Sequence, residues 1–398
     1  MSKLDELIQE HCPEGVEYKP LREIATVSRG GNFQKKDFCE AGVPCIHYGQ
    51  IYTKYGLFAD KTISFIGEES AKKQKMAVKN DIIMAVTSEN IEDVCKCVAW
   101  LGEDEVAVSG HSAIIHHSQD AKYLTYYFHT EMFAAQKRKL AHGTKVIEVT
   151  PDRLNDIKVP VPPLEVQREI VRILDNFTEL TAELTAELTA RKKQYEFYRD
   201  KLLTFDVHGG GTSRCDIRTF RIDELCNISR GKVISKDYIK EHPGKYPVYS
   251  SQTENDGILG CISEYAYDGE FITWTTDGAN AGTVFFRNGK FSITNVCGLL
   301  SRKNADLNLR YLYYVLTKDA GQYVNKGMGN AKLMSNVMAS IKISVPPLPV
   351  QQRIVEVLDN FDAICNDLTN GLPAEVEARR KQYEYYRDKL LTFKEKTA

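Results

Sequence analysis

The sequence lacks the two features that would place it in or across a membrane. It contains no run of about 18 uninterrupted apolar residues, the length that a membrane-spanning helix needs. Residues 1–10 are charged and lack the apolar stretch of a signal peptide. We therefore expect a cytoplasmic protein that has no membrane partner.

The ten cysteines include no C-x-x-C pair, the spacing that is typical of zinc sites and redox motifs. Cys95 and Cys97 are closest in sequence, and on a strand both thiols would point to the same face. A structural zinc site needs a second pair of ligands, and the sequence offers none at a suitable spacing. We expect reduced, buried thiols and no bound metal.

The chain also has little net charge, which is −2 at pH 7. A protein that binds nucleic acid on its own through charge is usually clearly basic. The near-neutral balance argues against that class of protein. It still allows local basic loops, or a partner that supplies most of the phosphate contacts.

Motifs of catalytic and nucleotide-binding sites are missing. There is no G-x-G-x-x-G after a strand and no G-x-x-x-x-G-K-[ST] loop, since phenylalanine follows Lys290. G-x-S-x-G and H-E-x-x-H are absent too. Residues 161–164 (VPPL) are not the Asn/Asp-Pro-Pro-Tyr/Phe tetrapeptide of adenine methyltransferases. His111, His116 and His117 lie close together, but no carboxylate or cysteine stands at ligand spacing. We infer that the chain is not an enzyme.

A long internal duplication is the most prominent feature that is present. Residues 161–177 (VPPLEVQREIVRILDNF) recur as residues 345–361 (VPPLPVQQRIVEVLDNF), at an offset of 184. Residues 193–205 (KQYEFYRDKLLTF) recur as residues 381–393 (KQYEYYRDKLLTF), at an offset of 188. The second copy therefore holds four more residues between its matched blocks. A period this long predicts a tandem of two domains and not a solenoid.

The duplicated segments carry the apolar spacing of long helices. In the first copy apolar residues recur in steps of three, four and seven, a heptad seam with one four-residue stutter at the tandem TAELTAEL of residues 181–188. In the second copy Gly371 can end a helix and Pro373 can begin the next. We predict one long spacer helix in residues 161–206 and a second in residues 345–398 that is kinked near 371–373. The apolar spacer positions are Leu180, Leu184, Leu188, Ile364 and Leu368.

Two matching seams in one chain can pair as antiparallel helices that form a coiled coil. About 40 residues of helix span on the order of 60 Å. Residues 207–214 are glycine-rich and predict a flexible linker between the halves. We expect a first recognition domain in residues 1–160 and a second in residues 215–344, one near each end of the helical pair. This pseudo-two-fold organisation matches the geometry of a dimeric DNA reader.

Both predicted domains have the pattern of mixed α/β (α+β) structure. Strand-like runs separated by glycine-rich turns include residues 82–86 in the first domain and 271–274 in the second. Each domain also has one expected helix rich in tyrosine, at residues 122–128 and 309–315. Tyrosines there could stack on bases, but packing into the core is the commoner role of an amphipathic helix.

Polar loops punctuated by glycine hold the candidate binding residues of both domains. An SRG triplet begins one such loop in each domain, at residues 28–30 and again at 229–231. Arg, Lys, Asn, Gln, Ser and Thr are the types that contact base edges and phosphates. The alternative is a set of ordinary solvated loops. The candidates in the first domain are Arg29, Asn32, Lys35, Lys36, Tyr48, Gln50, Lys54, Ser88, Asn90, His111, Thr144 and Lys145. The candidates in the second domain are Arg230, Lys232, Ser250, Ser251, Gln252, Thr275, Thr276, Asn280, Lys326, Asn330 and Lys332.

The duplicated blocks V-P-P-L-x-V-Q-x-x-I-V-x-x-L-D-N-F and K-Q-Y-E-[FY]-Y-R-D-K-L-L-T-F resemble the specificity subunits of type I restriction–modification enzymes. The tandem at residues 181–188 and the opening CPEGVEY at residues 12–18 are similar to that family as well, so the resemblance covers essentially the whole chain. It implies two target-recognition domains that each read one half of a bipartite DNA site. It also implies that the long helices set the distance between the half-sites and dock two methyltransferase subunits. The interruption at Gly371 departs from a continuous second spacer.

The resemblance further implies the partners and cofactors of the complex. Double-stranded DNA and two methyltransferase subunits would be partners, and restriction (motor) subunits could join them. S-adenosylmethionine would bind the methyltransferase subunits, and ATP and Mg would belong to the full complex, so this chain itself is expected to bind no cofactor. Three alternatives stay open: the specificity subunit of a related methyltransferase–nuclease system, a coiled-coil adaptor without DNA contact, and a self-contained enzyme.

Overall fold

The computed structural model describes residues 2–205, 217–327, 329–367 and 369–396. The chain forms two compact units, the first comprising Met1–Thr185 with Glu375–Ala398 and the second comprising Ala186–Ala374. Each unit combines a globular part with portions of both duplicated segments. The predicted linker, residues 207–214, and the predicted spacer residue Leu368 lie outside the described residues. Within the described ranges no helix is long and apolar enough to cross a membrane.

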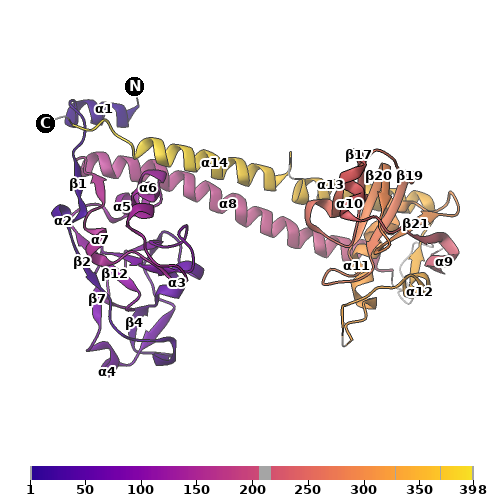
Figure 1. Cartoon of the computed structure of the whole chain (residues 1–398), viewed down its shortest axis with the longest axis horizontal. Coiled ribbons are helices and arrows are strands. Elements are labelled where there is room, and N and C mark those ends of the chain that lie inside the picture. The colour runs from indigo at the N-terminus through magenta and orange to yellow at the C-terminus, as the bar shows by residue number, and fades with distance from the viewer. Residues whose placement is uncertain (1, 206–216, 328, 368, 397–398) are drawn as a thin grey trace, which may run out of the picture. The chain divides into compact units, whose positions relative to one another are not determined.

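The globular part of the first unit is built on two five-stranded mixed sheets (Figure 1). The first sheet has, in spatial order, β2 (Ala25–Arg29), β12 (Ser112–His117), β8 (Ile82–Ala85), β10 (Cys97–Trp100) and β5 (Phe58–Ala59). The second has β3 (Phe38–Cys39), β6 (Ser64–Ile66), β4 (Val43–Ile46), β11 (Val106–Val108) and β7 (Lys75–Ala77). Two short ladders pair β1 (Tyr18–Pro20) with β14 (Lys158–Pro160) and β9 (Thr87–Ser88) with β13 (Ile147–Glu148). The helices before the long one are α1 (Lys3–His11), α2 (Leu21–Ile24), α3 (Tyr48–Thr53), α4 (Glu68–Ala71), α5 (Ala121–Tyr127), α6 (Glu131–Leu140) and α7 (Pro151–Leu154).

The globular part of the second unit repeats this plan around one larger sheet. Its spatial order is β16 (Cys226–Arg230), β21 (Cys297–Arg302), β19 (Tyr267–Thr275), β20 (Val284–Ile293), β17 (Pro243–Tyr249) and β18 (Ile258–Ile262). A short ladder pairs β15 (Arg218–Arg221) with β22 (Lys342–Val345), and the helices are α9 (Ile222–Leu225), α10 (Lys236–Glu241), α11 (Leu309–Asp319) and α12 (Ser335–Ser340). The order β16-β21-β19-β20 matches β2-β12-β8-β10, and the parallel pair β17–β20 matches β4–β11. The mixed α/β fold is confirmed, and both units share it although their upstream sequences match only faintly.

The two tyrosine-rich helices, α5 and α11, belong to the cores of their units. Asp120 caps α5 by accepting a hydrogen bond from the backbone N–H of Tyr123, and Asn308 caps α11 by accepting one from that of Tyr311. The prediction of core packing is confirmed, because the tyrosines that form these buried faces are Tyr123, Tyr126, Tyr127, Tyr311 and Tyr314.

The two duplicated segments form helices of different continuity. The first is a single helix of 40 residues, α8 (Leu164–Leu203). The second is divided into α13 (Leu348–Asn366) and α14 (Leu372–Leu390). Between them the side chain of Asp367 accepts hydrogen bonds from the backbone N–H groups of Thr369 and Asn370, and the N–H of Gly371 donates to the carbonyl of Asp367. The interruption therefore has its own hydrogen-bonded turn.

The duplicated helices pair antiparallel, and each unit holds one pair (Figure 1). In the first unit the rings of Phe177 in α8 and Tyr386 in α14 stack with their centroids 5.4 Å apart. In the second unit the rings of Tyr198 in α8 and Phe361 in α13 stack 5.8 Å apart. By the sequence duplication Phe177 is equivalent to Phe361, and Tyr198 to Tyr386. The same aromatic contact is therefore built twice, with the roles of the two copies exchanged.

The segment after α14 returns to the beginning of the chain and completes the first unit. Val16 and Glu395 form a parallel β-bridge. The hydroxyl of Tyr18 donates to the carbonyl of Phe393 and accepts from its N–H. Both ends of the chain thus belong to one folded unit.

We expect the substitution Gly371→Ala to destabilise the turn between α13 and α14. A Cβ atom there would lie 2.6 Å from the carbonyl oxygen of Ala363 and 2.7 Å from that of Asp367, closer than van der Waals contact allows. Relieving such overlap typically costs about 1–3 kcal/mol of unfolding free energy, which chemical denaturation would measure. Gly321→Ala is the matched control, because a Cβ there meets no atom within 4 Å. Equal stability of the two variants would contradict this account.

Candidate nucleic-acid interface

In each unit a hydrogen bond from a buried tyrosine to a half-buried aspartate fixes the globular part to its long helix. The hydroxyl of Tyr126 in α5 donates to Asp175 in α8 at 2.8 Å. The hydroxyl of Tyr314 in α11 donates in the same way to Asp359 in α13. Asp175 and Asp359 are equivalent by the duplication offset of 184, and the two tyrosines lie on the corresponding helices α5 and α11. The sequence repeat therefore encodes a repeated anchor between sheet and helix.

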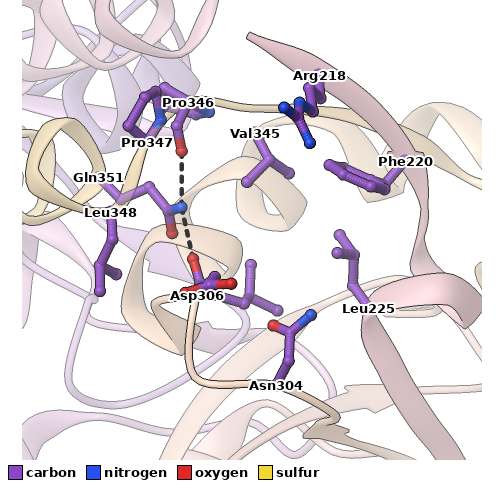
Figure 2. A pocket seen from close by; sticks show the side chains of 11 residues that line it. Arg218, Phe220, Leu225, Asn304, Asp306, Val345, Pro346, Pro347, Leu348 and Gln351 are labelled. Carbon is purple, nitrogen blue, oxygen red and sulfur yellow. Dashed lines mark hydrogen bonds between the residues drawn. The ribbon is translucent and has the colours of Figure 1, made fainter. Parts of the chain in front are cut away.

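A fully buried glutamine strengthens this anchor in both units. Figure 2 shows Gln351, whose amide donates to the carbonyl oxygens of Pro346 and Asp306, beside a cavity of about 370 Å³. Its oxygen accepts from the backbone N–H of Asn308, the residue that caps α11. Gln167 makes the equivalent bonds in the first unit. This network holds the start of each long helix against the tyrosine helix, so the loops beyond the sheet are carried on a rigid support.

In the first unit the backbone brings the predicted loops together at the ends of β2, β11 and β12. Gly31 forms a parallel bridge with Ser109, and its N–H donates to the carbonyl of Val108. The N–H of Tyr48, at the start of α3, donates to the hydroxyl of Ser109 at 2.8 Å. Three loops that are distant in sequence therefore meet at one place.

Side chains join two further loops to this cluster. The rings of Tyr48 and His111 lie 4.9 Å apart, and the imidazole of His111 hydrogen-bonds to the hydroxyl of Thr87 at 3.1 Å. The pairing of β9 with β13 brings the loop of residues 142–146 alongside, where Arg29 forms an ion pair with Glu148. We call these five loops the first loop cluster: residues 28–36, 47–54, 87–90, 109–111 and 142–148.

Most of the predicted residues of the first unit reach the surface of this cluster. The exposed ones are Arg29, Asn32, Lys35, Lys36, Lys54, Asn90, His111, Thr144 and Lys145, and the half-buried ones are Tyr48 and Ser88. Gln50 differs, because it is buried. Its amide oxygen accepts from the N–H of His47, and its amide nitrogen donates to the hydroxyl of Ser64. Gln50 holds α3 in place and offers no free group to a ligand.

The second unit builds the same arrangement from different side chains. Lys232 forms a parallel bridge with Thr294, as Gly31 does with Ser109. The hydroxyl of Thr294 donates to that of Ser250 at 3.0 Å, and the amide of Asn280 donates to the hydroxyl of Thr253 at 3.0 Å.

The fourth loop of the second unit is joined to the others through the backbone. Asp277 forms an antiparallel bridge with Lys332, and the N–H of Gly278 donates to the carbonyl of Ala331. We call these loops the second loop cluster: residues 229–234, 249–257, 275–280 and 325–332.

The predicted residues of the second unit divide between surface and interior. The exposed ones are Arg230, Lys232, Asn280, Lys326, Asn330 and Lys332, and the half-buried ones are Ser250, Ser251 and Gln252. Thr275 and Thr276 are buried, and their hydroxyls donate to the carbonyls of Asn280 and Val296. These two threonines shape the loop and are not available for base contact.

Two lysines beside the first loop cluster were missed by the sequence analysis. A Cβ on Gly31 would collide with the side chain of Gln74, so this residue packs directly against the loop. Its neighbours Lys73 and Lys75 are exposed, and neither has an ion pair in the described part of the chain. The sequence feature that could have identified them is the KKQK run at residues 72–75, but such a run is also typical of an ordinary solvated turn.

A buried arginine that sequence reasoning also missed supports the second loop cluster. Arg287 in β20 donates to the carboxylate of Asp256 at 2.6 Å and to its backbone carbonyl at 2.8 Å. Its guanidinium lies 3.6 Å from the ring centroid of Tyr249 and also donates to the hydroxyl of Thr273. Asp256 has a φ of 53°, a left-handed conformation that needs such support. No sequence signal marks this contact, because its partners lie far apart in the chain.

The cysteines and histidines considered as metal ligands have other environments. Cys95 and Cys97 are buried as predicted, and burial raises the pKa of the Cys95 thiol to about 12. Burial lowers the pKa of His117 to about 4, so its imidazole is neutral at pH 7. Among the described residues no three His, Cys, Asp or Glu side chains are grouped so that they could hold a metal ion.

We expect Arg287→Ala to loosen the loop of residues 249–257. The substitution removes three hydrogen bonds and the stacking on Tyr249. The unfolding free energy should fall by about 1–3 kcal/mol, and limited proteolysis should cut this loop faster than in the parent protein. Arg302→Ala is the matched control, since Arg302 is exposed at the end of β21 in the same sheet and has no ion pair in the described ranges. Unchanged proteolysis of the loop in Arg287→Ala would show that Arg287 does not position it.

The chain matches the family of type I restriction modification DNA specificity domains twice, over residues 13–191 and 215–378. A putative type I specificity subunit of Mycoplasma pneumoniae is 45% identical over 237 residues, which cover 58% of this chain and 92% of the relative. The specificity subunit of the type I restriction enzyme MpnII, from the same organism, is 37% identical over 301 residues, which cover 61% of this chain and 90% of the relative.

Solved structures share the fold. The S subunit of a type I restriction–modification system from M. genitalium superposes with a TM-score of 0.58 at 15% identity, over 95% of this chain and 96% of that one. A chain from another structure of a type I restriction–modification system superposes with a TM-score of 0.64 at 18% identity, over 96% of this chain and 98% of that one. Together with the two family matches, these findings show that the chain belongs to the specificity subunits of type I restriction–modification systems.

Proposed function

We propose that each loop cluster reads one half of a bipartite target in double-stranded DNA. One observation supports this above all: the same convergence of loops is built twice on equivalent strands, with different side chains at equivalent positions. Two different half-sites require different side chains, and the two units present them on the same backbone arrangement. The chain itself is a non-catalytic subunit that determines DNA sequence specificity, and it acts in a complex with other restriction–modification subunits.

The family implies the partners of this complex, and the charge of the chain fits a shared hold on DNA. With a net charge of −2, the chain has no overall excess of positive charge with which to hold DNA through counterion release alone. We therefore assign most phosphate contacts to two methyltransferase subunits that close around the duplex, with restriction (motor) subunits joining them. S-adenosylmethionine would bind those methyltransferase subunits, ATP and Mg would serve the full complex, and this chain would bind no cofactor. We place the complex in the cytoplasm.

Two equivalent exposed aromatic residues fit the docking of two copies of one partner. Phe197 on α8 is 62% exposed, and its equivalent Tyr385 on α14 is 61% exposed. Each has a lysine over its ring, Lys201 and Lys389 respectively. Large aromatic side chains that remain exposed are typical anchors of protein interfaces. The duplication provides such an anchor once in each unit.

We expect Phe197→Ala and Tyr385→Ala each to release one methyltransferase subunit. Native mass spectrometry of the purified complex should show one bound subunit for either variant, and none for the double variant. Glu196→Ala and Glu384→Ala are matched controls, because these residues are equivalent neighbours on the same helices. A complex that keeps two subunits in the double variant would exclude these rings as anchors.

The long helices are proposed to set the distance between the half-sites. Leu184 and Leu188 are half-buried in α8, whereas Leu180 is exposed there and Ile364 is exposed in α13. Four helical residues add about 6 Å and turn the helix by about 40° beyond a full circle. At about 3.4 Å for each base pair, this corresponds to a shift of about two base pairs.

Deleting residues 185–188, one TAEL-sized repeat, tests both the reading and the spacing. The methylated motif should keep both half-site sequences, while the number of bases between them changes by one or two. Methylome sequencing of cells that express the variant with its methyltransferase partner would measure this. An unchanged spacer would refute the role of the helices. Gel-shift of the intact complex provides the companion test, since binding that does not depend on sequence would favour an adaptor without DNA readout.

A further inference from the structure

The two loop clusters can be aligned residue by residue through their backbone bridges. Gly31 bridges to Ser109 in the first unit, and Lys232 bridges to Thr294 in the second, both in parallel register. The next residue along the chain is Asn32 in the first unit and Val233 in the second. These two positions are therefore equivalent, and they carry opposite chemistry. The amide of Asn32 offers hydrogen bonds, whereas Val233 offers only methyl groups.

Val233 is unusually exposed for an apolar residue. Its side chain is 80% exposed, more than any other large hydrophobic residue in the described ranges. It is flanked by Arg230 and Lys232, which are exposed and have no ion pair in that part of the chain. Arg230 donates a hydrogen bond to the sulfur of Met334. Two cations that no carboxylate neutralises in the described ranges, beside an uncovered apolar side chain, fit a ligand that is both anionic and locally apolar.

The surface around Val233 is hollowed, and both apolar and polar side chains line it, among them Glu264, whose carboxylate accepts a hydrogen bond from the hydroxyl of Tyr238. Val233 lines a cavity of about 510 Å³ together with Ile234, Ile262, Ile293, Tyr265 and Tyr267. Arg230 and Lys232 belong to the same lining. Since Val233 is largely exposed, it lies at the opening of this cavity, where a groove edge of DNA could reach it.

We propose that Val233 contacts the 5-methyl group of a thymine in the half-site that is read by the second unit. This inference rests on the proposed function, because it assigns one base contact to the second loop cluster. The thymine methyl is the one apolar group on the major-groove edge of the bases. Arg230 and Lys232 would bind the flanking phosphates and hold the duplex against the valine. At this position the second unit would distinguish thymine from the other bases by apolar contact with its methyl group and not by a hydrogen bond.

Replacement of thymine by deoxyuridine tests this contact, since it removes the methyl group and nothing else. Duplexes that carry the methylated motif, with each thymine of the second half-site replaced in turn, would be bound to the complex of this chain with its methyltransferase partner. We expect one position at which the dissociation constant rises roughly fourfold, because burying one carbon contributes about 0.8 kcal/mol and tenfold corresponds to about 1.4 kcal/mol. Uniform affinity across all replacements would overturn the proposal.

Substitution of Val233 identifies the protein side of the contact. Val233→Ala and Val233→Asn should fold normally because the side chain is exposed, and the sensitive position should become indifferent to deoxyuridine. Ile63→Asn is the matched control, as Ile63 is an exposed aliphatic residue of the first unit, and it should keep the parental profile. A sensitive position that persists in both Val233 variants would assign the methyl contact to another residue. Loss of all sequence dependence in the parental complex would instead refute the proposed function.

Discussion

The reciprocal stacking of Phe177 on Tyr386 and of Tyr198 on Phe361 is the contact on which the rest of the structure depends. Each ring pair joins one copy of the duplicated segment to the other, and each compact unit contains residues from both halves of the chain. Beyond the stacked Tyr386, the final segment returns to Tyr18, whose hydroxyl accepts a hydrogen bond from the N–H of Phe393. The duplication therefore supplies both sides of the contact, because each copy packs against the other.

The recognition loops inherit their positions from this helical frame. The Tyr126–Asp175 and Tyr314–Asp359 hydrogen bonds tie the tyrosine-rich helices α5 and α11 to a long helix. The sheet of each unit packs on its tyrosine-rich helix, and the strands of that sheet lead into the recognition loops. Because the tyrosines of these anchors are packed in the core, away from the loops, their geometry does not depend on the side chains at the loop surface. Exposed positions such as Val233 can therefore change while the backbone of the cluster stays the same. Because the backbone is fixed independently of the exposed loop side chains, one fold can recognise different DNA sequences.

The exposed aromatic rings and the lysines without ion pairs in the described ranges are surfaces that suit a larger complex. Phe197 and Tyr385 keep about three fifths of their area exposed, which an isolated protein would not favour. In the described part of the chain, Lys73 and Lys75 form no ion pair beside the first loop cluster. Apolar rings suit a protein partner, and unpaired cations suit phosphates. The near-neutral net charge then reflects a task that is shared with other subunits.

The sequence by itself determined the duplication, the helices and the tyrosine cores, because these depend on local periodicity and on residues close together in the chain. It also placed the interruption of the second helical segment near Gly371, since glycine and proline act locally on the backbone. Only the tertiary structure decided which polar loop residues are free. Gln50 and Thr275 are used internally, and Arg287 supports a loop that is distant in sequence. The physical reason is that a hydrogen bond needs both partners in place, and the fold alone brings such partners together.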